Sequence, residues 1–248
     1  MVTLDETSLA ILRMAGLYHV ATRSTIATLL PEGGEPDKRL AKLVKDGLLR
    51  IHKGLPGNRS VYQLSKKGAG AAGVSPARGR LAGAQSLLKN LGVLLFCHAS
   101  GTERHRVESE DLGKALGVEL PDGAYCLGRH KDKTIIFDCY VPGPLTPVAT
   151  VTWHLKKRVR HAKKIPTLAA AIKDRRYAFA IVVSNKARRK TIMDAVRTRA
   201  EGEKVALINR AQIWVEAVTD FGLLIGTAGN HLASMSSGAN QTLLWPEP

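Results

Sequence analysis

The sequence predicts an α+β protein with two domains, and three observations support this. The chain has 248 residues, and about 150 residues per domain is usual, so one or two domains are expected. Within the first 64 residues two short helical patterns, a basic helical pattern and a hairpin pattern follow one another. Beyond residue 86, strand-like runs alternate with helical ones, which is typical of an α/β layer architecture.

Two helices are expected in the first 31 residues. Apolar residues recur at helical spacing after an acidic start at Asp5, and this helix should run to about Leu17. Either Thr22 or Ser24 could cap a second, shorter helix that stops at Pro31.

A third helix, capped by Asp37 and ended by Gly47, is expected to have one apolar and one cationic face. The apolar residues recur at i, i+3, i+4 and i+8, and they are Leu40, Leu43, Val44 and Leu48. The cationic residues lie opposite this stripe or on its shoulder, and they are Lys38, Arg39, Lys42 and Lys45. A helix packed by its leucines would present these cations to a DNA major groove.

A hairpin should follow, with strands at 48–52 and 60–64 and a Gly- and Pro-containing loop between them. Lys53 and Arg59 in this loop would contact phosphates. The whole order is that of a winged helix-turn-helix, so we predict a DNA-binding domain at residues 1–72. The alternative is that the basic helix is merely a solvated face.

Residues 73–86 belong to a Gly- and Ala-rich run and are predicted to be a linker. The second domain is expected at 87–225. Its first residues, 87–97, have a helical pattern that becomes strand-like. Helices are then expected at 107–116, 153–164, 168–174 and from 185 to about 200. Strands are expected at 124–127, 134–141, 178–184 and 205–209. Residues 226–248 are rich in Gly, Ser and Ala and are predicted to be a flexible tail.

The composition indicates an acidic partner. Lys and Arg total 37 against 21 Asp and Glu, which gives a formal net charge of +16 and a pI near 10.0. Nucleic acid is favoured over membrane, because no apolar run approaches the roughly 20 residues that span a bilayer. The N-terminus lacks the pattern of a signal peptide, so a cytoplasmic protein is expected. The three cysteines have neither zinc-site nor disulfide-framework spacing.

Motifs in both halves carry a resemblance to a known family. In the first half they are residues 11–23, 39–50 and 61–69; in the second half they are 120–125 (Leu-Pro-Asp-Gly-Ala-Tyr), 135–141 (Ile-Ile-Phe-Asp-Cys-Tyr-Val) and 179–184 (Phe-Ala-Ile-Val-Val-Ser). Together they resemble the replication-relaxation proteins of plasmids and integrated elements, relatives of the MobC-type relaxases of mobilisable plasmids. The resemblance implies that the second domain has an α/β restriction-endonuclease-like fold of the PD-(D/E)xK type, intact or degenerate.

The chemistry of that fold needs two carboxylates that share a divalent cation and a lysine that stabilises developing charge. The positions that match the family's motif are Asp122 and Asp138, which would bind Mg²⁺ or Mn²⁺ if the site is active, but Tyr140 stands where the lysine belongs. Lys156 or Lys157 of the next helix could replace the lysine, and Tyr140 could itself be a nucleophile. The alternative is that Asp122 belongs to a simple turn that needs no metal and that Asp138, shortly before Pro142, marks a sheet edge.

The helix at 153–164 is a second basic element. Its apolar residues Leu155, Val159 and Ala162 should face the core. The cations predicted to touch nucleic acid are Lys157, Arg160, Lys163 and Lys164. The basic run at 186–190 is a further cationic cluster.

Three functions are compatible with these patterns. The first is sequence-directed binding of double-stranded DNA in mobilisation, relaxosome function or replication control, with other relaxosome or replication proteins as partners. The second is a metal-dependent MobC-like relaxase or nickase that uses Asp122 and Asp138. The third is a transcriptional repressor whose second domain serves oligomerisation. A homodimer is among the assemblies expected.

Overall fold

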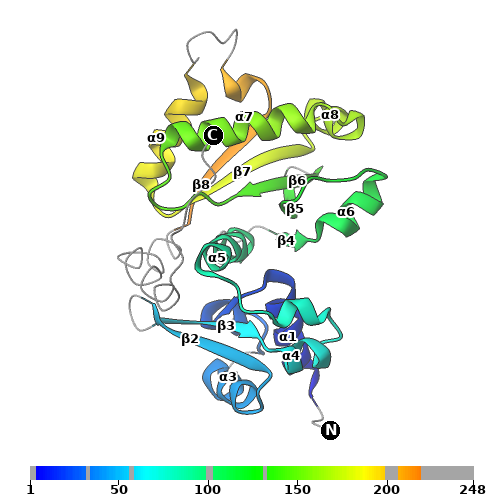
Figure 1. The fold of residues 1–248 in the computed structure, drawn as a ribbon, viewed down its shortest axis with the longest axis vertical. Helices are drawn as coiled ribbons and strands as arrows, with labels where there is room; N and C mark the ends of the chain where they lie inside the picture. The colour runs from blue at the N-terminus through cyan, green and yellow to red at the C-terminus, as the bar shows by residue number, and fades with distance from the viewer. Residues whose placement is uncertain are drawn as a thin grey trace.

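The computed structural model describes residues 4–31, 34–55, 59–98, 103–130, 133–198 and 206–218, and it has a mixed α+β architecture with two sheets (Figure 1). The smaller sheet lies at one end of the long axis and the larger sheet toward the other end. Helix α5, Ala84–His98, lies between them. No described helix has the length and apolarity needed to cross a membrane.

The first half holds a three-stranded antiparallel sheet with the order β1-β3-β2. Its elements in chain order are α1 (Glu6–Tyr18), β1 (Ala21–Thr22), α2 (Arg23–Ala27), α3 (Pro36–Lys45), β2 (Leu49–Leu55), β3 (Arg59–Leu64) and α4 (Lys66–Ala71). The predicted order of three helices and a hairpin is therefore present.

Most helix ends in this half lie at or near the residues predicted from the sequence. Asp5 caps α1, Thr22 caps α2, and Gly47 follows α3 with a left-handed φ of 71°. Two details were wrong. Helix α2 already ends at Ala27. Asp37 does not cap α3, because the helix begins at Pro36 and Asp37 lies in its first turn, where its carboxylate accepts hydrogen bonds from Arg23.

The run predicted as a linker is held against the first half. It contains a short 3₁₀ helix, η1 (Pro76–Gly79). A Cβ atom added at Gly79 would lie 2.6 Å from the Ser65 carbonyl oxygen, so only glycine allows this close approach. Arg78 of the same turn pairs with Glu108 at 2.6 Å. Within the described residues this connection is therefore packed rather than free.

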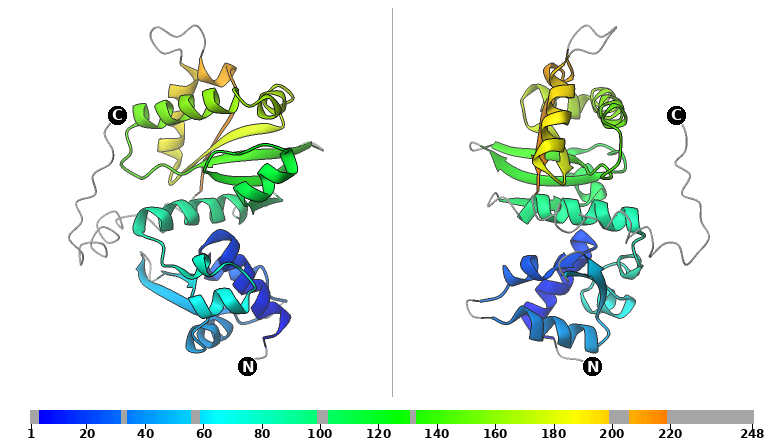
Figure 2. Two further views of the ribbon diagram at one scale, coloured as in Figure 1. Left: turned by 45° about the vertical axis from the view of Figure 1, so that its right-hand side comes forward. Right: turned by 90° about the vertical axis from the view of Figure 1, so that its left-hand side faces the viewer.

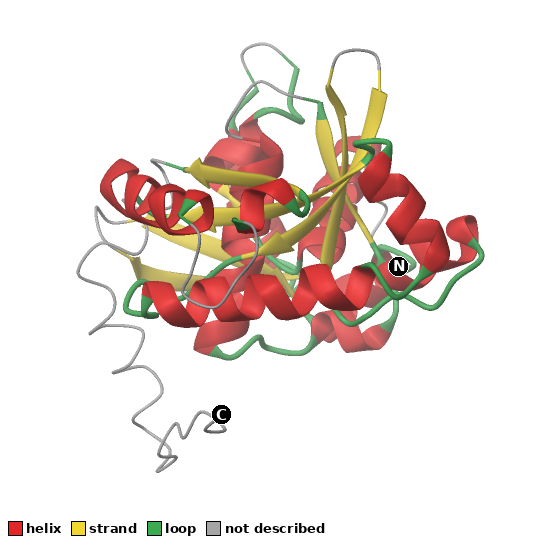
Figure 3. Cartoon of the chain, turned by 90° about the horizontal axis from the view of Figure 1, so that it is seen from above, coloured by secondary structure: helices red, strands yellow, loops and turns green. Residues whose placement is uncertain are grey.

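The second half holds a five-stranded sheet with the order β4-β5-β6-β7-β8, in which β4, β5 and β6 pair antiparallel and β6, β7 and β8 pair parallel. After α5 its elements are β4 (Arg104–Val107), α6 (Ser109–Leu116), β5 (Ala124–His130), β6 (Lys133–Tyr140), α7 (Val148–Ala162), α8 (Pro166–Lys173), β7 (Tyr177–Val183), α9 (Lys186–Arg197), η2 (Leu207–Asn209) and β8 (Gln212–Ala217). Figure 3 shows the strands in yellow with the helices in red around them, seen from above.

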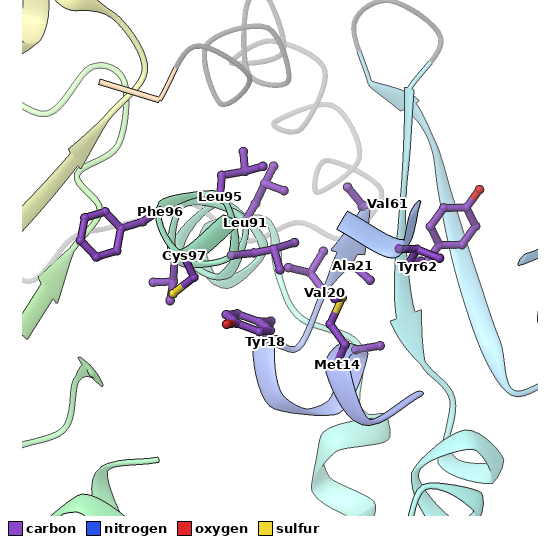
Figure 4. Packing of buried hydrophobic residues seen from close by; sticks show 14 of the residues in the cluster. Met14, Tyr18, Val20, Ala21, Val61, Tyr62, Leu91, Leu95, Phe96 and Cys97 are labelled. Atoms are coloured by element: carbon purple, nitrogen blue, oxygen red, sulfur yellow. The ribbon is translucent and has the colours of Figure 1, made fainter. Parts of the chain in front are cut away.

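Strand alternation divides the core into two clusters, one on each face of this sheet. On one face, Tyr125, Ile136 and Phe179 pack against α6, α7, α8 and α9. On the other face, Cys126 and Phe137 pack against α5 and belong to a cluster that continues into the first half. Figure 4 shows Phe96 on the side of α5 that faces the larger sheet, and Tyr18 and Val20 on the side of α5 that faces the first half. The two halves therefore share one continuous core.

Three sequence predictions for the second half were wrong. Residues 87–97 are helical throughout, and residues 207–209 form a 3₁₀ turn where a strand was expected. Strand β4 and the last strand, β8, were not predicted. The predicted C-terminal tail, 226–248, lies outside the described residues.

Candidate nucleic-acid interface

Helix α3 exposes the cationic face that its sequence predicts. Leu40 and Leu43 are 2% and 1% exposed, whereas Lys38, Lys42 and Lys45 are exposed. Two of these lysines, Lys42 and Lys45, lie in the last turn of the helix, where a cation also interacts favourably with the helix dipole. The charge on this face therefore stabilises the helix as well as being available to a partner.

The three lysines differ in what they contact. Lys38 Nζ lies 2.9 Å from a carboxylate oxygen of Glu35, in a pair whose side chains are both largely exposed. Lys42 and Lys45 have no ion-pair partner among the described residues. These two ammonium groups therefore carry the uncompensated charge of α3.

Arg39 differs from the prediction, because its guanidinium contacts the protein. Arg39 Nη1 donates to Asp5 at 2.6 Å and to Ser8 Oγ at 3.2 Å, and so joins α3 to the N-terminus of α1. The Ser8 amide and the Arg39 guanidinium together lower the pKa of Asp5 to about 2. Arg39 orients α3 in this arrangement.

The hairpin is described only in part. Arg59 opens β3 and is partly exposed. Lys53 belongs to β2, but its side chain and the loop at 56–58 lie outside the described residues.

The candidate catalytic acid Asp138 is buried on β6 and already has a partner. Its two carboxylate oxygens accept hydrogen bonds from Arg158 of α7, one from Nε at 3.0 Å and one from Nη2. The Asp138 side chain is 6% exposed and that of Arg158 is 25% exposed. A bidentate pair of this kind satisfies both charges and leaves little room for another cation at the carboxylate.

Asp122 is exposed in the turn before β5, and the register pairs Tyr125 with Asp138. Asp122 therefore lies outside the sheet, three residues before the position of β5 that pairs with Asp138. No group of three His, Cys, Asp or Glu side chains among the described residues could hold a metal ion. Because Asp138 is engaged by Arg158 as well, the described residues do not fit the predicted Mg²⁺ or Mn²⁺ site.

The other predicted catalytic residues, Tyr140 and Lys156, do not take the place of the metal site. Burial raises the pKa of Tyr140, with the charge of Arg188 acting in the opposite direction, so its phenolate is scarce at neutral pH. The Tyr140 ring lies 5.6 Å from that of His154. Lys156 is partly buried on α7. Among the described residues, the net effect on Tyr140 is a raised pKa, which does not favour it as a nucleophile.

The outer side of α7 agrees with the prediction. Leu155, Val159 and Ala162 are buried. The exposed cations on and just after the helix are Lys157, Arg160, Lys163 and Lys164. The sequence reasoning did not single out Trp153, which is 51% exposed on the same helix.

Sequence reasoning also missed Arg158, although the sequence contains a signal for it. Arg158 follows Leu155 by three residues and precedes Ala162 by four, so it lies within the apolar stripe. A cation inside such a stripe needs a buried acidic partner. The nearest acid before it in the sequence is Asp138.

Comparison of the chain with models of protein families, with curated proteins and with solved structures finds no match.

Proposed function

We propose that the protein binds double-stranded DNA, with α3 in the major groove and the β2–β3 hairpin beside it as a wing. The observation that carries this proposal is the pair Lys42 and Lys45, which are exposed and unpaired within the described residues on a helix whose opposite face is buried. Ammonium groups held this way form phosphate contacts or donate to guanine edges.

The arrangement around α3 supports the proposal. The element order and the β1-β3-β2 sheet are compatible with a winged helix-turn-helix and support the proposal. Two ion pairs, Arg39 with Asp5 and Arg23 with Asp37, join α3 to α1 and α2. Because these pairs restrict the helix, little ordering is required when it enters a groove.

For the second half we propose a degenerate nuclease-like fold that does not cleave DNA. Its order α5-β4-α6-β5-β6-α7-α8-β7, with an antiparallel hairpin followed by a parallel crossover, is compatible with the restriction-endonuclease-like fold implied by the resemblance. The ion pair of Asp138 with Arg158 favours binding over metal-dependent nicking. The role in mobilisation or replication control follows from the resemblance alone, and a repressor would use the same DNA-binding surface.

A gel-shift titration at fixed salt tests the proposal. The double variant Lys42→Ala/Lys45→Ala should weaken duplex binding about tenfold and reduce the dependence of log K on log[salt] by about 1.8, since each lost phosphate contact contributes about 0.9. Lys173→Ala removes an exposed cation from α8 and serves as the control. Equal affinities of the double variant and the control would contradict the proposal.

A supercoiled-plasmid assay with Mg²⁺ or Mn²⁺ tests the second half. We expect no nicking by the wild-type chain. Metal-dependent nicking that disappears in Asp138→Ala would establish the relaxase alternative instead.

A further inference from the structure

The exposed side of α7 carries a regular stripe of one aromatic and three cationic residues. The stripe consists of Trp153, Lys157, Arg160 and Lys164, spaced at i, i+4, i+7 and i+11, and all four are exposed. Residues at this spacing lie on one face of a helix, so the stripe is roughly 16 Å long at 1.5 Å per residue. Lys164 lies two residues past the end of the helix, at Ala162.

Trp153 is one of three exposed large apolar residues in the described chain, with Leu81 and Leu145. It is 51% exposed, although tryptophan is highly buried on average. Its ring is held edge-on to that of His154 at 4.8 Å, and Lys157 Nζ lies 5.4 Å from the ring centroid. The indole is therefore fixed at the surface beside a cation.

The stripe has no local acidic counter-charge. The sequence contains no Asp or Glu between Asp138 and Asp174, and Asp138 is buried and paired with Arg158. Arg160 and Lys164 have no ion-pair partner among the described residues. The positive potential along this helix is therefore available to an anionic partner.

We propose that this stripe binds single-stranded nucleic acid, with an unpaired base stacked on Trp153 and the backbone phosphates on Lys157, Arg160 and Lys164. Stacking on an exposed aromatic ring combined with a cationic track is how proteins hold single strands without reading their sequence. In a duplex both faces of a base are covered by its neighbours, so an intact duplex offers the indole no stacking partner. A membrane is a poorer fit, because the apolar side of α7 is buried against the sheet and Trp153 is the one large apolar residue exposed on the described helix, with Leu145 exposed before its start.

The position of the stripe separates it from the proposed duplex site. Helix α3 lies at one end of the long axis of the molecule and α7 toward the other end (Figures 1 and 2). The two helices thus address different segments of nucleic acid. This inference goes beyond the proposed function and rests on other residues, so either can fail alone.

Fluorescence anisotropy with the full chain tests the proposal, using labelled oligonucleotides of about 15 nucleotides, which covers the usual site size. Four probes are needed: a DNA strand, an RNA strand of the same sequence, an abasic DNA strand and a DNA duplex. Trp153→Ala should weaken binding to the DNA or RNA strand about tenfold, in the range expected for one stacked base. Its binding to the abasic strand and to the duplex should not change. The comparison of DNA with RNA shows which strand is preferred.

Further variants separate stacking from charge. Trp153→Phe keeps an aromatic face and should restore most of the affinity lost in Trp153→Ala. Lys157→Ala/Arg160→Ala should weaken binding to all single strands and reduce the salt slope by about 1.4, at about 0.7 per phosphate contact. Lys66→Ala, an exposed cation of α4, is the matched control and should leave single-strand binding unchanged.

Three outcomes would overturn the proposal. The first is unchanged affinity of Trp153→Ala for the normal strands while its thermal melt is that of the wild type. The second is an equal loss on the abasic strand. The third is binding to phosphatidylserine vesicles that requires Trp153 and is not displaced by the oligonucleotide, which would identify a membrane surface.

Discussion

Replacing Asp138 by asparagine should destabilise the fold, because Asp138 forms a structural ion pair. The substitution keeps the shape of the side chain but leaves the Arg158 guanidinium without its counter-charge. Breaking a buried pair in this way costs 3–5 kcal/mol. Because the Arg158 side chain retains 25% of its exposure, water screens part of that cost, and we expect about 3 kcal/mol.

Urea unfolding followed by circular dichroism measures this change. With a slope of about 3 kcal/mol per molar urea, the unfolding midpoint of Asp138→Asn should fall by about 1 M. The double variant Asp138→Leu/Arg158→Met replaces the pair by apolar side chains and should recover to within about 1 kcal/mol of the wild type. Recovery would show that the uncompensated charge, rather than the lost aspartate, causes the destabilisation.

The same variants test the metal alternative. A cation that bound only the folded state would raise the melting temperature as its concentration increased. We expect millimolar Mg²⁺ to leave the melting temperature of the wild type unchanged. The reasoning is refuted if Asp138→Asn unfolds at the wild-type urea midpoint, or if Mg²⁺ stabilises the wild type and has no effect on Asp138→Asn.

Two further predictions concern stability. Burial and two neighbouring arginines lower the pKa of His19 to about 4, whereas its value in the unfolded chain is near 6.5. The contribution of neutral His19 to the free energy of unfolding should therefore be complete above pH 6.5. It should decline as the pH falls toward 4, by up to about 3 kcal/mol. His19→Asn, which tolerates the left-handed φ of 60°, should reduce this pH dependence in urea titrations between pH 7 and 4.5, and an unaltered dependence would exclude His19 as its source. Gly128→Ala would place a Cβ 2.9 Å from Arg104 Cγ and should cost about 1–3 kcal/mol, whereas Gly70→Ala in α4, with open space around it, should stabilise by up to about 1 kcal/mol. If thermal melts show both alanine variants to be equally stable, the predicted crowding at Gly128 is absent.

Local chemistry made the elements around α3 predictable. Leucines at helical spacing, a glycine able to take positive φ and a polar cap each act within one or two turns, and Leu40, Gly47 and Thr22 occupy the expected positions. Long-range partners were not predictable in this way. The bonds of Arg39 to Asp5 span 34 residues of sequence, and no short-range pattern indicates them.

The misread segments have physical causes as well. Helix α5 is covered on several sides by the continuous core, so its apolar residues, among them Leu94 and Phe96, are not confined to one stripe, and a helix of this kind resembles a buried strand in sequence. The edge strand β4 contains Arg104 and Arg106, whose polar character hid it. The Arg104 side chain is nevertheless only 5% exposed; it pairs with Glu216 at 2.7 Å and lies 4.1 Å from the centroid of the Phe96 ring.

The charge of α7 is divided between its two sides, and this division connects the structural and functional proposals. On the inner side, Arg158 neutralises Asp138, the acid that a nuclease would need for its metal. On the outer side, Lys157 and Arg160 face solvent with no acid in the helix. A carboxylate that is paired internally repels phosphate less than a free one, so the same ion pair is compatible with the proposed approach of a nucleic acid backbone. If both proposals hold, the absence of cleavage and the binding of nucleic acid would depend on opposite sides of the same arginine-bearing helix.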